Sequence, residues 1–245
     1  MIAIIGGSGL TNLSTLTVKR REVVRTPYGE PSGALTFGVL AGHDILFLAR
    51  HGYGHTIPPH EINYRANLWA LKETGVKHII AVASVGGIRD YFGPGTLVVP
   101  DQIIDYTCGR RHTFFEGPDA PVTHIDFTWP YSKALRAKLL DAARRANETV
   151  YDGGVYGVCQ GPRLESVAEI ARMEKDGCDL VGMTGMPEAA LARELGLEYA
   201  CLSVVVNHAA GKGDSAEAIS VEHLGVVMQQ TMQLVQRILE ETIKP

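Results

Sequence analysis

The sequence predicts an α/β protein with a mixed central sheet flanked by helices. Apolar runs of strand length alternate along the chain with segments of helical periodicity, a pattern typical of a largely parallel or mixed sheet covered on both faces. The 245 residues are 45% hydrophobic and 20% charged, which is enough for one large core. No internal repeat, low-complexity tract or linker interrupts the pattern, so we expect a single domain over residues 1–245.

The first third of the chain predicts a buried strand, a hairpin and a helix. "MIAIIGG" (1–7) is an apolar run that ends in a glycine-rich turn, and residues 11–24 return to a strand-like pattern. "ALTFGVLAGHDILFLARHG" (34–52) is typical of a hairpin that turns at "AGHD". "PPHEINYRANLWALKETG" (58–75) predicts a helix with proline near its start and glycine at its end.

The rest of the chain alternates strands with helices. We expect strands at 78–87, 95–104, 155–161, 179–184 and 199–207. We expect helices at 131–147, 166–177, 186–196 and about 221–241. The second of these opens on Ser166 as a cap and closes on Gly177. The segment 108–129 has no regular pattern, and long irregular loops often carry function.

The composition excludes several classes of partner. The net charge is −4 and no cluster of Lys or Arg is present, so there is little attraction for nucleic acid or an anionic membrane. The four cysteines lack CxxC or Cys/His spacing, which indicates reduced thiols in a cytoplasm and no metal site. The N-terminus lacks a basic region and a long apolar run, so it predicts neither a signal peptide nor a membrane span. A small-molecule partner is therefore expected.

Four strand ends carry groups that can bind an anion. "GGSGL" (6–10) offers backbone N–H groups and the Ser8 hydroxyl, Arg50 and His51 follow a second strand, and Ser84 and Thr184 follow two more. An arginine fork suits phosphate oxygens, and a histidine can donate beside it. Taken singly, Arg50 and His51 could be a surface pair, but the four strand ends together indicate one anion site. The turn matches neither GxGxxG nor a P-loop, since no helix and no GK[ST] follows it.

Two further polar residues have both a functional and a structural interpretation. Asn207 ends an apolar strand, where α/β proteins place ligand groups, although Asn before His and small residues also suits a turn. Glu165 follows another apolar strand, where it could equally be an exposed glutamate near a helix start. The residues alone leave both alternatives open.

Several motifs together resemble the trimeric purine nucleoside phosphorylase and methylthioadenosine phosphorylase family. They are "IIGGSGL", "ARHGYGHTIPPHEINYRANLWALKETGV", "CQGPRLES", "VGMTGMPE" and "SVVVNHAAG", in the family's order from residue 2 to about residue 240. The resemblance implies the three-layer nucleoside phosphorylase fold. It also implies an enzyme that cleaves the N-glycosidic bond of a purine nucleoside with inorganic phosphate, giving a free base and an α-ribose-1-phosphate derivative. Phosphate is then a substrate, and no metal or organic cofactor is expected.

The resemblance assigns roles to residues at matching positions. The implied phosphate ligands are Ser8, Arg50, His51, Ser84 and Thr184. The implied nucleoside contacts are Val85 and Leu164 beside the purine, Met183 against the ribose, and Val221 and Leu224 at the 5′ substituent. His124 would complete the 5′ pocket of the neighbouring subunit in a homotrimer. Glu165 and Asn207 would be the catalytic groups at the polar edge of the purine.

The polar edge implied in this way fits a 6-oxopurine. The Asn207 amide can accept from a protonated N7 and donate to O6, which stabilises the leaving base. Glu165 can accept the N1–H of hypoxanthine or guanine, a proton that neutral adenine lacks. The methylthioadenosine branch of the family carries Asp at the position of Asn207, another Asp where this sequence has Ala209, and usually Ser at the position of Glu165. Both residues here therefore disfavour adenine.

The 5′ end resembles the other branch. Enzymes for inosine and guanosine place a histidine at the position of Val221, whereas Val221 and Leu224 would form an apolar wall that suits a 5′-methylthio group. Without the resemblance, the two residues could equally belong to the core stripe of the last helix. The combination implies 5′-methylthioinosine as the substrate, with hypoxanthine and 5-methylthioribose 1-phosphate as products.

Three alternatives stay open from the sequence. A related phosphorylase for methylthioadenosine, or for inosine and guanosine, would share every phosphate ligand and differ only in its selectivity for the base and the 5′ group. A nucleoside hydrolase would use water in place of phosphate. A nucleotide-binding or regulatory module would bind a ligand without turning it over.

Overall fold

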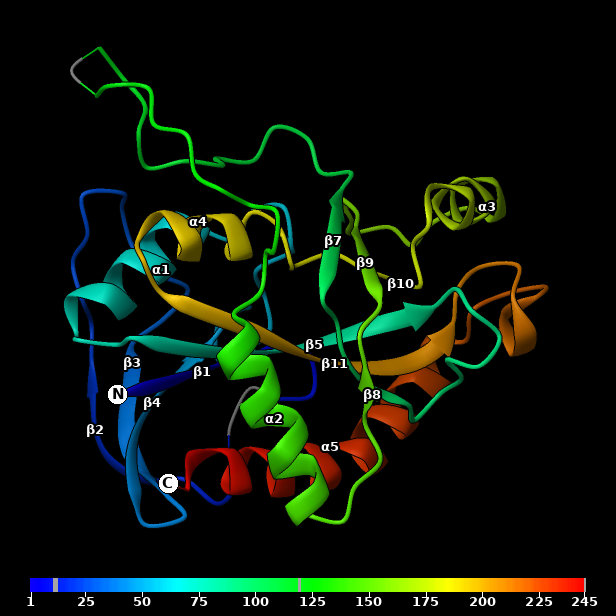
Figure 1. Ribbon diagram of the computed structural model, residues 1–245, viewed down its shortest axis with the longest axis horizontal. Helices are drawn as coiled ribbons and strands as arrows, with labels where there is room; N and C mark the ends of the chain where they lie inside the picture. Colours follow the sequence, from blue (N-terminus) through cyan, green and yellow to red (C-terminus); the bar gives the residue numbers. More distant parts are fainter. Residues whose placement is uncertain (11–12, 119, 245) are drawn as a thin grey trace.

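The computed structural model describes residues 1–10, 13–118 and 120–244, and an 11-stranded mixed sheet lies at its centre (Figure 1). The strands are β1 (Ile2–Gly6), β2 (Thr17–Glu22), β3 (Leu35–Leu40), β4 (His43–Ala49), β5 (His78–Gly87), β6 (Leu97–Val99), β7 (Gln102–Asp105), β8 (Tyr151–Asp152), β9 (Val155–Val158), β10 (Leu180–Gly182) and β11 (Glu198–His208). The main path runs β2-β3-β4-β1-β5-β10-β9-β7, while β11 joins β5 to β6 and β6 pairs with β8. Parallel pairs such as β1–β4 adjoin the antiparallel hairpin β3–β4, which confirms the expected mixed sheet.

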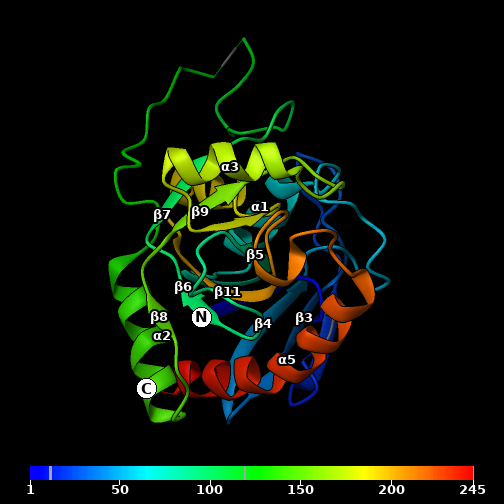
Figure 2. The ribbon, with the colours of Figure 1, turned by 90° about the vertical axis from the view of Figure 1, so that its right-hand side faces the viewer.

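Helices cover both faces of this sheet. They are α1 (Tyr64–Glu73), α2 (Lys133–Arg145), α3 (Val167–Asp176), α4 (Glu188–Glu194) and α5 (Val221–Ile243), with a short 3-10 helix η1 (Gly213–Ser215) after β11. Figure 1 shows α1 and α4 on one side of the sheet and α2 and α5 on the other, and in Figure 2 α1 and α5 again lie on opposite sides. This arrangement confirms the three-layer architecture that the sequence predicts.

The side chains of each strand alternate between two cores, as the pleat of a strand requires. In β1, Ala3 and Ile5 pack with the core under α1 and α4, whereas Ile4 packs with the core under α2 and α5. A smaller cluster under α3 contains Ile170 and Met173. The near-continuous apolar runs of the central strands are explained by this burial on both faces.

The helix expected from residue 58 begins later, at Tyr64. Asn63 caps it, because the Asn63 side chain accepts a hydrogen bond from the backbone N–H of Ala66 at 3.1 Å. Pro58 and Pro59 lie in the turn before the helix, where the Tyr64 hydroxyl donates to the Pro59 carbonyl at 2.9 Å. The expected start was wrong because the asparagine is the stronger helix-start signal.

The single strand expected over 95–104 was also wrong, since two strands form there. In β6, Val98 lies opposite Ser203 of β11 in an antiparallel pair, whereas β7 pairs in parallel with β9. Pro100 stands between the two strands, and a proline has no N–H to give to a ladder. The two-residue strand β8 was not expected, because a segment that short leaves no periodic pattern to read.

The parallel strands bring several of the expected strand ends to one edge of the sheet. Gly6 at the end of β1 lies opposite Ala49 at the end of β4, so the turn that carries Ser8 leaves the sheet beside Arg50. Strand β10 runs antiparallel to β5 with Val181 opposite Gly86, so the residues after β10 run back along the end of β5 toward Ser84.

Strand β11 ends at this edge in an irregular pairing with β5. Val205 lies opposite Val85, and then the register shifts so that Asn207 lies opposite Gly86. Val206 is thereby the extra residue of a β-bulge, and a bulge redirects the side chains around it. The bulge therefore sets the direction of Asn207 at the strand end.

Within the described residues, no helix is both long and apolar enough to cross a bilayer.

Candidate active site

One cavity lies where these strands end. The strand ends of β1, β4, β5, β10 and β11, the loop after β9 and the first turn of α5 line it. Of the expected site it contains Ser8, Arg50, His51, Ser84, Val85, Leu164, Glu165, Met183, Thr184, Asn207 and Leu224. The structure thus brings the expected anion-binding groups and the expected base-edge groups together.

The remaining two expected residues are Val221 and His124. Val221 begins α5, but its side chain lies outside the part of the chain that the structure describes. His124 is exposed in the long connection between β7 and α2, which projects away from the sheet (Figure 1). The contact of His124 with a neighbouring subunit stays a prediction.

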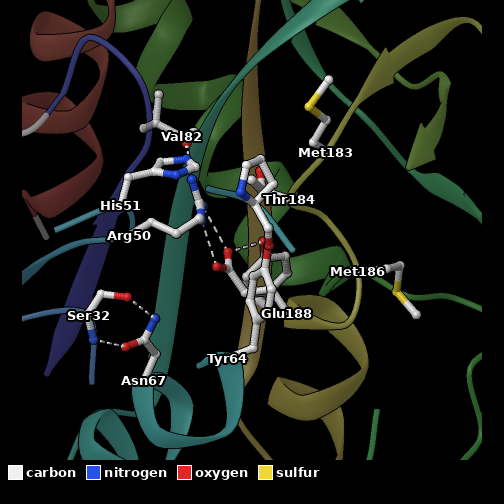
Figure 3. Close-up of polar contacts among 12 residues, drawn as sticks. Ser32, Arg50, His51, Tyr64, Asn67, Val82, Met183, Thr184, Met186 and Glu188 are labelled. Carbon is white, nitrogen blue, oxygen red and sulfur yellow. Dashed lines mark hydrogen bonds and ion pairs between the residues drawn. The ribbon is translucent and has the colours of Figure 1, made fainter. Parts of the chain in front are cut away.

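Arg50 is fully buried and held by an equally buried carboxylate (Figure 3). Its Nε donates to Glu188 Oε2 at 2.7 Å, its Nη2 donates to Glu188 Oε1 at 2.8 Å, and its Nη1 donates to the Val82 carbonyl at 2.9 Å. Burial alone would lower the pKa of Arg50, but the charge of Glu188 and its hydrogen bonds, with smaller contributions from Tyr199 and Tyr64, together raise that pKa above its ordinary value. Since a guanidinium has five N–H donors, one N–H on each terminal nitrogen is left for a ligand.

Glu188 is itself fixed from a third direction. The Tyr199 hydroxyl donates to Glu188 Oε1 at 2.8 Å, so the carboxylate is bonded by Arg50 and by Tyr199 together. The site analysis from sequence missed Glu188, although it ends the motif "GMTGMPE". A glutamate in the first turn of a helix is common on protein surfaces, so only its zero exposure identifies it as the partner of Arg50.

His51 is neutral near pH 7 and accepts rather than donates toward the cavity. Its Nδ1 lies 2.8 Å from the Ile57 carbonyl, so Nδ1 must carry the hydrogen and Nε2 bears the lone pair. Burial, and then the charge of Arg50, lower the pKa of His51 to about 4. Such a nitrogen is suited to accept a hydrogen bond from the P–OH of a protonated phosphate oxygen.

The glycine-rich turn approaches Arg50 closely. A Cβ at Gly7 would come within 2.8 Å of Arg50 Nη1 and 2.7 Å of the Val82 carbonyl, so this position requires glycine. The hydroxyl of Ser8 lies 3.4 Å from Nε2 of His55, an exposed residue that sequence reasoning did not single out. The turn, Arg50, Ser84 and Thr184 therefore line the same cavity.

Asn207 lines the same cavity, and its amide has unused donor and acceptor groups. Its Nδ2 donates to the His208 carbonyl at 2.5 Å, which fixes the plane of the amide. An amide group has a second N–H and an oxygen with two lone pairs. Asn207 is 8% exposed, so the turn interpretation left open by the sequence gives way to a buried polar group that faces the cavity.

Glu165 has an unsatisfied oxygen. Its Oε1 is buried and has no hydrogen-bond partner among the described residues. Burial, and a smaller contribution from Glu169, raise the pKa of Glu165, whereas its backbone N–H and Cys159 act in the opposite direction. A buried acceptor without a donor is costly, so this oxygen is matched to a ligand that brings an N–H. An ordinary exposed glutamate, the other interpretation, does not fit.

Size alone does not identify the site. Larger cavities, of about 530 and 650 Å³, lie against α3 and between α2 and α4. They do not combine a buried arginine, hydroxyls and a buried amide as the cavity at the strand ends does. Among the described residues, no group of three His, Cys, Asp or Glu side chains is arranged to hold a metal ion.

Comparison with known proteins places this site in a family. The sequence matches the phosphorylase superfamily over residues 1–244. It is 55% identical, over 92% of this chain and 90% of the relative, to a probable S-methyl-5′-thioinosine phosphorylase of Xanthomonas campestris. It is 48% identical, over 86% of this chain and 80% of the relative, to a 6-oxopurine nucleoside phosphorylase of Pyrococcus furiosus.

A solved structure agrees with these matches. A methylthioadenosine phosphorylase from Schistosoma mansoni, in complex with adenine, superposes with a TM-score of 0.94 and 33% identity, covering 99% of this chain and 90% of that one. The fold expected from the motifs is confirmed by this superposition. The chain therefore belongs to the phosphorylase superfamily.

Proposed function

We propose that the protein is a purine nucleoside phosphorylase that cleaves S-methyl-5′-thioinosine with inorganic phosphate, giving hypoxanthine and 5-methylthio-α-D-ribose 1-phosphate. The observation that carries the proposal is the composition of one cavity. It holds anion-binding donors, an unsatisfied acceptor on Glu165, the amide of Asn207 and the apolar side chain of Leu224. The relative in Xanthomonas campestris that is named for this substrate supports it.

In the reaction, a phosphate oxygen forms a bond to C1′ while the C1′–N9 bond breaks. The electron pair of the broken bond goes to the purine, which takes up at N7 the proton that hydrogen phosphate gives up as it becomes the sugar ester. In the proposed role of Arg50, its two free N–H groups bind phosphate oxygens, with the hydroxyls of Ser8, Ser84 and Thr184 beside them. His51 accepts from a protonated phosphate oxygen through Nε2, because its Nδ1–H is committed to Ile57. No metal or organic cofactor is part of this proposal.

The purine is stabilised as it gains electrons. The Asn207 oxygen accepts from N7–H as that proton arrives, and the remaining amide N–H donates to O6. Glu165 Oε1 accepts the N1–H, which satisfies its unpaired oxygen. Adenine offers no N1–H and turns an exocyclic donor toward the Asn207 N–H, so a methylthioadenosine phosphorylase is the less favoured alternative.

A second candidate is a 6-oxopurine nucleoside phosphorylase for inosine and guanosine. The relative in Pyrococcus furiosus bears that name, and the same base edge serves hypoxanthine and guanine. The difference lies at the 5′ end, where Leu224 supports a methylthio group because a 5′-hydroxyl beside it would lose its hydrogen bond to water.

We further propose a cytoplasmic homotrimer in which His124 completes the site of a neighbouring subunit. The connection that carries His124 exposes Val122 at 81% and Trp129 at 63%. Apolar side chains this exposed on one projecting segment are typical of a subunit contact.

The test is base release from 5′-methylthioinosine, 5′-methylthioadenosine and inosine, each with and without phosphate. We expect fast release from methylthioinosine only with phosphate, about 10⁴-fold slower release from methylthioadenosine, and about tenfold or greater loss with inosine. Equal release without phosphate would indicate a hydrolase, and binding without release would indicate a regulatory module. Inosine turned over as well as methylthioinosine would favour the second candidate.

A further inference from the structure

Arg110 is a second buried arginine, and it lies outside the cavity lining. It stands near the start of the long connection after β7 and is 8% exposed. Its guanidinium is bonded to three separate segments of the chain. Nη1 donates to the carbonyls of Met183 at 2.8 Å and Met186 at 2.6 Å and to the Tyr64 hydroxyl at 3.3 Å. Nη2 donates to the carbonyls of Gln160 at 2.8 Å and Cys159 at 3.2 Å. Nε donates to Gln160 Oε1 at 3.1 Å.

These bonds use every N–H of the side chain. A guanidinium has five N–H groups, and the two terminal nitrogens and Nε are all directed at protein acceptors. The acceptors are backbone carbonyls, an amide oxygen and a hydroxyl rather than carboxylates. Arg110 therefore has no donor to offer a substrate, in contrast to Arg50, whose terminal nitrogens each retain one N–H.

The segments that Arg110 joins are those that face the nucleoside. The loop after β9, whose carbonyls accept from Nη2, continues to Leu164 and Glu165. The segment after β10 carries Met183, whose carbonyl accepts from Nη1. The two segments also touch directly, since a Cβ at Gly161 would come within 2.4 Å of Met183 Sδ. Arg110 therefore fixes the spacing between the loop that carries Glu165 and the segment that carries Met183.

The phosphate end depends much less on Arg110. Thr184, next to Met183, belongs to a segment that Arg110 holds, whereas Ser8, Arg50, His51 and Ser84 extend from β1, β4 and β5. The Arg50 guanidinium is held by Glu188 and Val82. Glu188 stands two residues after Met186, but its carboxylate is also held by the Tyr199 hydroxyl of β11. A substitution at Arg110 should therefore weaken nucleoside binding more than phosphate binding.

We propose that Arg110 is a positioning residue for nucleoside recognition, which sets the geometry of the Glu165 loop and the Met183 segment relative to each other. The inference rests on the proposed phosphorylase function. It requires the forked guanidinium itself, because a lysine ammonium has three donors on one nitrogen and cannot satisfy the six acceptors that Arg110 engages. A displacement of about 1 Å in such a frame can cost about 100-fold in rate.

The experiment compares Arg110→Lys with wild type and with Arg136→Lys. Arg136 is the matched control, because its guanidinium also donates to backbone carbonyls, those of Pro100 at 2.9 Å and Val99 at 3.1 Å, away from the cavity. We measure kcat, the KM for 5′-methylthioinosine, the KM for phosphate and the thermal midpoint. For Arg110→Lys we expect the KM for the nucleoside to rise about tenfold and kcat to fall about tenfold, while the KM for phosphate changes less than about threefold.

Two further measurements keep the result decisive. Arg110→Ala assayed with added guanidinium should regain part of its nucleoside affinity, because the free cation can occupy the vacated position. Hypoxanthine-induced shifts of the thermal midpoint compare the same variants without turnover. The inference is overturned if Arg110→Lys has the wild-type kcat and KM values. It is also overturned if both Arg110→Lys and Arg136→Lys lose activity only in proportion to the folded protein that they lose. Wild-type enzyme that releases no base from any nucleoside instead overturns the proposed function.

Discussion

Two buried arginines in this protein have opposite tasks, and their hydrogen-bond partners distinguish them. Arg50 is held by Glu188 and Val82 but keeps an N–H on each terminal nitrogen. Arg110 is saturated by carbonyls and an amide. The sequence contained a reason to select Arg50, which follows a strand beside a histidine, but none to select Arg110, which lies in an irregular segment. The partners of a buried cation depend on segments far apart in sequence, so they are visible only in the fold.

Replacing Arg50 by lysine tests its task. A lysine cannot engage both Glu188 oxygens, the Val82 carbonyl and a phosphate oxygen, so we expect the KM for phosphate to rise about 100-fold with a change of less than about threefold in the KM for the nucleoside. Steady-state kinetics with each substrate varied separately measure this. Arg89→Lys is the control, because Arg89 donates to Asp179 at 2.7 Å outside the cavity lining and its replacement should leave both constants unchanged. An unchanged KM for phosphate in Arg50→Lys would contradict the proposed phosphate site.

At the scale of elements, the sequence identified most strands and helices but not all of their ends. Helix α3 was expected closely, because Ser166 and Glu169 form a capping box and Gly177 adopts the left-handed conformation that ends the helix. The predicted start of α1 was too early because Pro58 and Pro59 resemble the first turn of a helix. Strands β6 and β7 were predicted as one strand because both halves of that run are apolar. The two strands differ in their pairing partners, β11 for β6 and β9 for β7, and these partners are distant in sequence, so a local pattern does not reveal them.

The bulge in β11 shows the same limit within a functional element. The sequence placed Asn207 at a strand end, but the residue that bulges and the resulting direction of the amide follow from pairing with β5. Glu165 was likewise ambiguous in sequence, and its unsatisfied Oε1 favours the functional interpretation. The positions of the site residues could thus be predicted, whereas their partners, burial and free donors could not.

At the scale of the whole molecule, the site exists because the parallel strands β1, β4, β5 and β11 end on one edge of the sheet and the antiparallel β10 returns along β5 to it. Motifs separated by more than a hundred residues meet there, as α/β topology predicts. The long connection after β7 reaches the site through Arg110, and its exposed apolar side chains led us to propose a trimer.

The proposed assembly makes its own prediction. Sedimentation equilibrium should give three times the mass of one chain. His124→Ala should raise the KM for methylthioinosine and leave the KM for phosphate nearly unchanged, because His124 would contact only the 5′ end of the nucleoside. A monomer with full activity would contradict the assembly. It would leave the chemistry within one subunit intact.

The central claim is that Asn207 and Glu165 select a 6-oxopurine while the 5′ end accepts a methylthio group. The most direct measurement is the ratio of kcat/KM for 5′-methylthioinosine to that for 5′-methylthioadenosine, in the wild type and in the Asn207→Asp, Glu165→Ser double variant. We predict a wild-type ratio of about 10⁴ that falls by about 100-fold or more in the double variant, since both mismatches with adenine are removed. A wild-type ratio near one, or a ratio that the double variant leaves unchanged, would contradict the account.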